Sequence, residues 1–102
     1  MASEDPFLSG EYGTHYAIGM QGASNGGLLT AVTTIKHWAA YSLENSDGMS
    51  RHTFNANITP YSLASSYFPA FYRALTVGKA RGVMCSYNVS RRPAECSRRM
   101  AS

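Results

Sequence analysis

The chain has 102 residues, of which 15% are charged and 12% are aromatic, and its formal net charge is +3. A typical globular domain carries about 25% charged residues, and a small domain has much surface relative to its volume. Low charge with many aromatic side chains therefore indicates a piece from the interior of a larger fold. The longest apolar runs fall far short of the roughly 20 residues that a membrane span needs, so we expect no membrane partner.

The basic residues concentrate in the last quarter of the chain: Lys79, Arg81, Arg91, Arg92, Arg98 and Arg99. A basic tail can bind nucleic acid, but no nucleic-acid-binding motif accompanies these charges. A solvated end explains them better, and we expect no nucleic-acid partner. The two cysteines, Cys85 and Cys96, match no zinc motif and are too few for a disulfide framework. Cys85 lies in an apolar run and is most simply a small core residue.

The first predicted elements are a helix and a buried strand. The helix runs from Phe7 to about Gln21, because apolar residues recur there at four-residue spacing, and Ser9 can serve as its N-cap. The turn G22-A-S-N-G-G27 ends it. From Leu28 to about Ile35 the sequence is β-branched without polar alternation, which is typical of a strand buried on both faces.

A long loop, a second helix and a second strand follow. Residues 42–57 are polar and irregular, and a loop of this length is often functional. Thr59 opens the second helix, Pro69 should kink it or start a new turn, and Gly78 suits its C-terminal cap. The stretch G82-V-M-C-S-Y87 is a short strand that ends in Asn88.

This order of elements predicts an α/β fold with a parallel sheet. Parallel α/β folds place ligand chemistry at the carboxyl ends of their strands. Lys36 and His37 follow the first predicted strand, and Tyr87 and Asn88 end the second. A lysine is almost never fully buried unless it is paired. The Lys36–His37 pair is therefore either an ordinary strand end or part of a site.

Four segments, in order and spacing, resemble the N-terminal domain of glycoside hydrolase family 3, and in particular its β-xylosidase-like members: E4-D-P-F-L-S-G-E-Y12, K36-H-W-A-A-Y-S-L-E-N45, R51-H-T-F-N-A-N57 and V83-M-C-S-Y-N88. The resemblance covers residues 4–88 of a partial domain at 1–102, and the basic tail 89–102 diverges from it. It implies a fragment of a (β/α)8 TIM-type barrel, with about two strands and two helices from its middle, because such a barrel needs about 250 residues.

The resemblance also implies a function. It indicates a retaining glycosidase of the β-xylosidase, α-arabinofuranosidase or β-glucosidase type, which acts on an oligosaccharide or glycoside without a metal or other cofactor. By the same resemblance we expect an extracellular protein. However, M1-A-S-E-D-P6 has neither the basic nor the apolar region of a signal peptide. Asn57 and Asn88 begin N-glycosylation patterns, which matter only in a secreted chain.

The resemblance assigns four residues to the sugar. It implies that Lys36 and His37 bind hydroxyls of the glycone, that Arg51 also reaches the sugar, and that Tyr87 lies beside the nucleophile. Convergent donors and acceptors of this kind suit a hydroxyl-rich ligand. A solvated loop arginine at position 51 and a core tyrosine at position 87 are the alternatives. Packing explains Trp38 as well as a role as a sugar platform does.

The two catalytic carboxyl groups fall outside the resemblance. A retaining glycosidase needs them about 5–5.5 Å apart. The family pattern puts the nucleophilic aspartate on the strand after S86-Y-N88 and the acid/base further along. We therefore expect no catalysis from this chain by itself. The alternative function is a catalytically dead remnant that binds a sugar or a partner.

Overall fold

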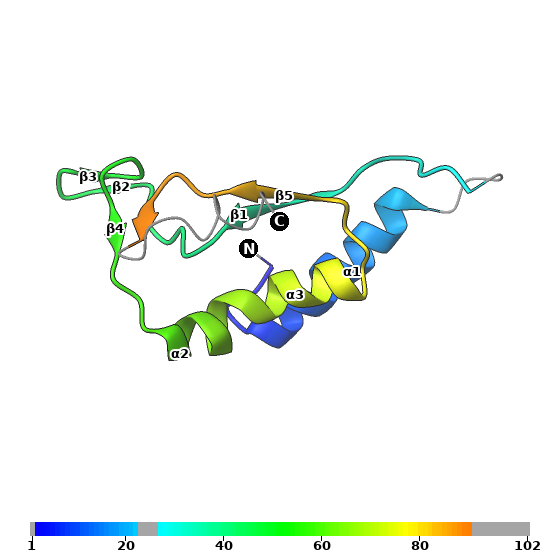
Figure 1. Cartoon of the computed structure of the whole chain (residues 1–102), viewed down its shortest axis with the longest axis horizontal. Helices are drawn as coiled ribbons and strands as arrows, with labels where there is room; N and C mark the ends of the chain where they lie inside the picture. The colour runs from blue at the N-terminus through cyan, green and yellow to red at the C-terminus, as the bar shows by residue number, and fades with distance from the viewer. Residues whose placement is uncertain (1, 23–26, 91–102) are drawn as a thin grey trace, which may run out of the picture.

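The computed structural model describes residues 2–22 and 27–90, the last two for their backbone only, so the predicted tail lies outside the described residues from Arg91 onward. In chain order the elements are α1 (Pro6–Gln21), β1 (Thr34–Trp38), β2 (Asn45–Ser46), β3 (Met49–Ser50), β4 (Asn55–Ala56), α2 (Pro60–Ser62), the π-helical segment η1 (Leu63–Tyr67), α3 (Phe68–Thr76), β5 (Gly82–Cys85) and β6 (Val89–Ser90). Helices α1 and α3 form one layer, and the strand pair β1–β5 forms the other (Figure 1). The α/β prediction is therefore confirmed.

Helix α1 begins one residue earlier than predicted and with a different cap. The side chain of Asp5 accepts a hydrogen bond from the backbone N–H of Phe7 at 2.9 Å, and Pro6 occupies the first helical position. This arrangement satisfies a donor that the first turn leaves without a helical partner. Ser9, the predicted cap, lies inside the helix, where its hydroxyl donates to the carbonyl oxygen of Ser3 at 2.7 Å.

Strand β1 lies further along the chain than predicted. Thr34 pairs with Gly82 and Ile35 with Val83 in a parallel ladder, which confirms the parallel pairing but not the range 28–35. A strand extends only where a partner backbone is present, and β5 starts opposite Thr34. Leu28 and Val32, in the part predicted as buried strand, are 75% and 66% exposed.

The register of β1 shifts at Lys36 and His37. Ile35 pairs with Val83 and Trp38 with Cys85, so two residues of β1 lie opposite the single residue between those partners. An extra residue of this kind is a β-bulge, which changes the direction of side chains and is frequent beside functional sites. Lys36 and His37 thus lie within β1, not after its end as predicted.

The second helical region is divided, as Pro69 predicts. Thr59 caps α2, since its hydroxyl accepts a hydrogen bond from the N–H of Ser62 at 3.1 Å. The backbone then forms the π-helical η1 and returns to α-helix at Phe68, the residue before Pro69. A proline suits the first turn of a helix because its missing N–H would have no partner there.

The end of α3 corrects the prediction for Gly78. Helix α3 ends at Thr76, and the left-handed residue after it is Lys79, with φ 55°. Gly78 serves the packing of the two helices instead. A Cβ atom at this position would lie 2.7 Å from the carbonyl oxygen of Ala74 and 3.0 Å from Cα of Thr14. No other residue type fits this gap without a shift of backbone.

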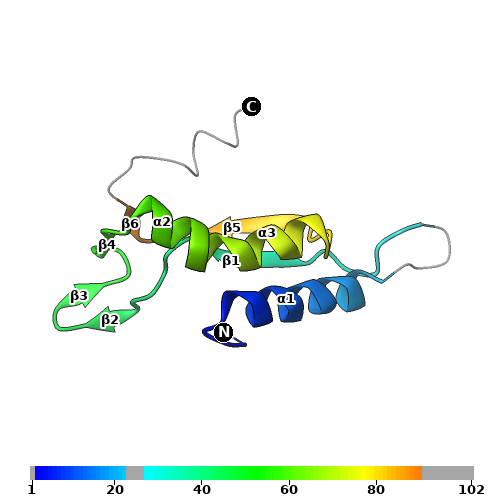
Figure 2. The same cartoon turned by 90° about the horizontal axis from the view of Figure 1, so that it is seen from below.

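Small residues bring α1 and α3 together, side by side along their length (Figure 2). Gly10 and Gly13 of α1 face Ala70 and Ala74 of α3. An ion pair between Glu11 of α1 and a basic residue of α3, Arg73, borders this contact. The helix layer therefore depends on close backbone approach and not on large interdigitating side chains.

Gln21 joins the helix layer to the start of both strands. Its side chain is 5% exposed; its amide nitrogen donates to the carbonyl of Lys79 at 3.0 Å, and its amide oxygen accepts from the N–H of Thr33 at 3.3 Å. A buried amide is stable when both of its ends are satisfied in this way. These bonds fix the segments that lead into β1 and β5.

The described part of the chain has a thin core. Its buried apolar residues are all alanines: Ala17, Ala40, Ala56, Ala74 and Ala80. The radius of gyration is 15.1 Å, against about 13 Å for a compact domain of this size. Cys85 is disulfide-bonded and only partly buried, which corrects its assignment as a small core residue; Cys96 lies outside the described residues. In the described ranges no helix is long and apolar enough to cross a membrane.

Candidate functional site

The predicted loop at 42–57 contains a hairpin that the sequence analysis missed. Strands β2 and β3 pair antiparallel, with Ser46 opposite Met49. Between them, Asp47 and Gly48 have φ angles of 51° and 79°. Two left-handed residues in a two-residue turn are typical of a type I′ hairpin, for which Asp-Gly is a strong sequence signal. That signal was present in the sequence and could have identified the hairpin.

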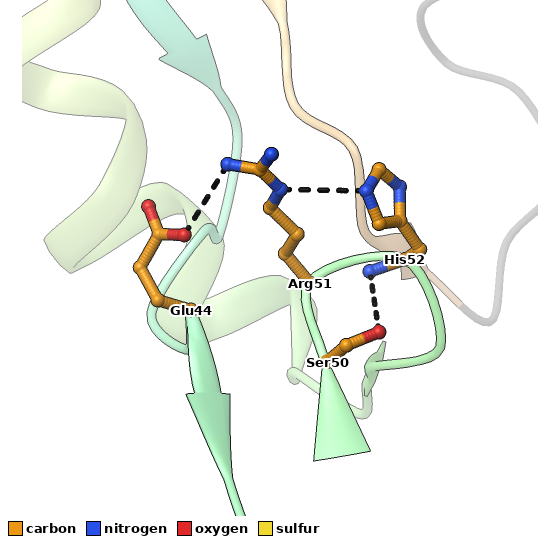
Figure 3. Close-up of polar contacts among 4 residues, drawn as sticks. All are labelled: Glu44, Ser50, Arg51 and His52. Carbon is orange, nitrogen blue, oxygen red and sulfur yellow. Dashed lines mark hydrogen bonds and ion pairs between the residues drawn. The ribbon is translucent and has the colours of Figure 1, made fainter.

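The hairpin places Glu44 and Arg51 opposite each other, one residue beyond each strand. The backbone N–H of Arg51 donates to the carbonyl of Glu44 at 2.9 Å. Nη1 of Arg51 also lies 3.5 Å from Oε2 of Glu44, and its Nε donates to Nε2 of His52 at 3.4 Å (Figure 3). Arg51 therefore has two side-chain partners, while 43% of its side chain remains exposed, as expected for the alternative of a solvated loop arginine.

The guanidinium of Arg51 also stacks on Tyr87. Its central carbon lies 5.0 Å from the centroid of the Tyr87 ring, and His52 approaches the same ring edge-on at 5.2 Å. A cation over an aromatic face is attracted by about 0.5–1 kcal/mol at exposed sites. Tyr87 remains 48% exposed, so it is not the core tyrosine that was its alternative.

Tyr41 connects the stacked pair of Arg51 and Tyr87 to His37. Its ring lies 4.7 Å from the His37 ring and 6.5 Å from the Tyr87 ring, centroid to centroid. A row of ring contacts thus runs from β1 through Tyr41 and Tyr87 to Arg51. Three of the four predicted sugar ligands, His37, Arg51 and Tyr87, therefore lie in one cluster. Tyr41, which lies between them, was not predicted as a site residue. No pattern in the sequence singles out Tyr41, because its contact with Tyr87 joins two segments that are far apart in the chain.

The charges around Tyr41 alter its acidity. Partial burial, and then the Glu44 carboxylate, raise the pKa of the Tyr41 phenol, while Arg51 lowers it. The interaction is reciprocal: the Tyr41 phenol raises the pKa of the Arg51 guanidinium. Both groups therefore keep their ordinary charge at neutral pH: a neutral phenol next to a cation.

The segment after β5 is fixed to the turn after β1. The N–H of Ser86 donates to the carbonyl of Trp38 at 2.6 Å, and its hydroxyl donates to the carbonyl of Ala39 at 3.1 Å. Nδ2 of Asn88 donates to the same Ala39 oxygen at 3.5 Å. These bonds hold Tyr87 beside β1. Oδ1 of Asn88 is buried without a hydrogen-bond partner among the described residues, so one acceptor beside the end of β5 is not satisfied there.

Lys36 differs from the other three predicted ligands. Its side chain is exposed, and within the described part of the chain it makes no hydrogen bond, ion pair or ring contact. Its three N–H donors remain available to a ligand. Among the described residues, no three His, Cys, Asp or Glu side chains gather closely enough to hold a metal ion. The assignment of all four residues to a sugar stays a prediction.

Comparison with known proteins shows which solved structures contain a similar segment. A glycoside hydrolase family 3 exo-β-xylosidase, solved in complex with a xylobiose aziridine activity-based probe, matches the chain with a TM-score of 0.81 at 38% identity, over 86% of this chain and 11% of that one. An exo-1,3/1,4-β-glucanase from a Pseudoalteromonas species matches with a TM-score of 0.64 at 26% identity. The first of these matches confirms the predicted resemblance of the chain to part of the N-terminal domain of glycoside hydrolase family 3.

The chain is also similar to curated β-xylosidases from a plant and a fungus. A probable β-D-xylosidase 7 from Arabidopsis thaliana is 38% identical over 91 residues, a match that spans 83% of this chain and 12% of the relative. A probable exo-1,4-β-xylosidase from Aspergillus clavatus is 44% identical over 86 residues and spans 83% and 11%. The chain thus covers about a tenth of the length of the β-xylosidases that it resembles. No protein-family model matches it.

Proposed function

We propose that this chain forms part of the sugar-binding subsite of a β-xylosidase-type glycosidase, on a segment of a (β/α)8 barrel. One observation carries the proposal. Ring contacts through Tyr41 join His37, Tyr87 and Arg51, from three separate segments, in one cluster near the carboxyl ends of β1 and β5. Parallel α/β folds bind their ligands at this edge. The crystallographic relative that carries a xylobiose-derived probe supports a carbohydrate as the ligand.

The chemistry of the cluster suits a small, hydroxyl-rich sugar. Arg51 has five N–H donors in a fixed plane, of which two bind Glu44 and His52. The donors that do not face these partners or Tyr41 remain for hydroxyl oxygens, together with the ammonium of Lys36. His37 adds a ring nitrogen that can donate or accept. Polar groups that a sugar desolvates must be paired, because each unpaired one costs about 1–3 kcal/mol.

The test is a titration of the 102-residue chain with xylobiose, followed by calorimetry or by NMR chemical shifts. We expect saturable binding that Lys36→Ala, His37→Ala or Arg51→Ala each weakens about tenfold or more, since a hydrogen bond to a charged group contributes about 1.5–3 kcal/mol. Lys79→Ala is the matched control, because Lys79 is exposed and precedes β5 at its other end. Absence of saturation up to millimolar sugar contradicts the proposal.

A second assay separates sugar binding from catalysis. We expect the chain by itself to release no 4-nitrophenol from 4-nitrophenyl β-xyloside, while the whole protein to which this segment corresponds would hydrolyse β-linked xylosides or arabinosides. Turnover by the 102-residue chain would contradict the first expectation. Binding without turnover by the whole protein would favour the alternative, a catalytically dead sugar-binding protein.

A further inference from the structure

We propose that Tyr41 is the positioning residue of this site: its ring sets the orientation of His37 and Tyr87, and its hydroxyl sets that of Arg51. Tyr41 is not one of the predicted ligands, yet it is the residue that contacts the side chains of all the clustered ones. The inference rests on the proposed function where it concerns the sugar, but the positioning itself can be tested without a ligand.

The position of Tyr41 explains how its ring acts. It follows Ala40, a buried residue with φ 61°, so the chain turns sharply just after β1. The turn brings the Tyr41 ring back against His37, four residues earlier, at 4.7 Å and an inclination of 47°. On its other side the ring meets Tyr87, inclined by 57°. Tilted aromatic pairs at these separations are attractive.

The hydroxyl has a separate role. The Tyr41 ring adjoins the Tyr87 ring, over which the guanidinium of Arg51 lies. In this position the Tyr41 phenol interacts with both members of the ion pair that closes the hairpin, Glu44 and Arg51, which raise and lower its pKa respectively. Without the hydroxyl, the guanidinium of Arg51 would still contact Glu44, His52 and the face of Tyr87. It would lose one partner, and its orientation would be less restricted. The ring and the hydroxyl of one residue therefore control different neighbours.

This division makes the proposal testable with two substitutions. Tyr41→Phe keeps the ring and removes the hydroxyl, and Tyr41→Leu removes both. The readouts are the side-chain NMR resonances of the His37 ring and of the Arg51 Nε–H group. Matched controls are Tyr61→Phe and Tyr61→Leu, because Tyr61 is 81% exposed and makes no ring contact within the described ranges.

We expect Tyr41→Phe to shift the Arg51 resonance and leave His37 in place, and Tyr41→Leu to shift both, while the Tyr61 variants shift neither. A general loss of structure would shift both resonances in Tyr41→Phe as well, so it would not produce this difference between the two variants. For xylobiose we expect affinity to fall about threefold to tenfold in Tyr41→Phe, the range for one hydrogen bond, and further in Tyr41→Leu.

Two outcomes overturn the inference. The first is that Tyr41→Leu leaves both resonances where they are in the unsubstituted chain. The second is that the chain binds xylobiose and neither Tyr41 variant changes its affinity. If the unsubstituted chain binds no xylobiose, the proposed function fails, and the resonance experiment still decides whether Tyr41 positions its neighbours.

Discussion

The ring of Trp38 stacks on the ring of Phe68, with centroids 4.8 Å apart and planes inclined by 5°. Phe71 meets the same indole edge-on at 5.1 Å. Strand β1 is thereby joined to α3 through aromatic packing. This contact resolves the two interpretations of Trp38, because a ring covered by the helix layer is not a platform for a sugar.

Replacement of Trp38 should therefore affect stability and not the sugar site. We expect Trp38→Leu to lower the free energy of unfolding by about 2–3 kcal/mol, because it removes buried area and two aromatic pairs. Trp38→Phe should cost less, since a ring remains. Urea denaturation followed by far-UV circular dichroism measures both changes. Tyr61→Leu, at an exposed position, should stay within about 0.5 kcal/mol of the unsubstituted chain.

Two glycines should respond to alanine with opposite signs. At Gly78 an added methyl group meets the backbone of Ala74 and Thr14, so we expect Gly78→Ala to destabilise the chain by about 1–3 kcal/mol. At Gly19, within α1, nothing lies within 4 Å of the added atom, and alanine should stabilise the helix by about 0.5–1 kcal/mol. The fluorescence of the single tryptophan reports both unfolding transitions. Equal effects of the two substitutions would contradict this account of the α1–α3 contact.

The hairpin should depend on the left-handed conformation of Gly48. We expect Gly48→Ala to weaken it by about 1–2 kcal/mol, the cost of a Cβ atom in this region. Asp47→Asn is the control, because asparagine adopts the same conformation readily. Nuclear Overhauser contacts between Asn45 and Ser50 should weaken in the first variant only. If they persist in both, the turn does not determine the position of Arg51.

The acidity of Tyr41 gives a prediction with a definite sign. Because Glu44 raises the pKa of the phenol, Glu44→Gln should lower it, and Arg51→Gln should raise it. An acid whose pKa is raised by folding stabilises the chain below its unfolded pKa of about 10, and this contribution is lost as pH rises through the folded value. Titration of tyrosinate absorbance, with Tyr41→Phe subtracted to isolate one of seven tyrosines, measures the shifts. A pKa unchanged in Glu44→Gln would contradict the placement of Glu44.

Features that depend on neighbours in sequence were predicted well. The range of α1, the cap at Thr59 and the break near Pro69 all follow from local patterns of side chains and from the geometry of proline. The order of elements also predicted the parallel pair β1–β5. The Asp47–Gly48 turn was not predicted, although its sequence signal is equally local.

Local patterns were therefore enough to predict the helices, the α/β class and the resemblance to a family, since periodicity and short motifs act over a few residues. The site, in contrast, depends on long-range packing. The bulge at Lys36 and His37 shifts the register of β1, and a shift of one residue reverses the direction of every later side chain in a strand. The meeting of His37, Tyr41, Arg51 and Tyr87 also requires contacts across up to fifty positions of chain. No periodic pattern carries that information, because it arises from how the strands and the hairpin pack in three dimensions.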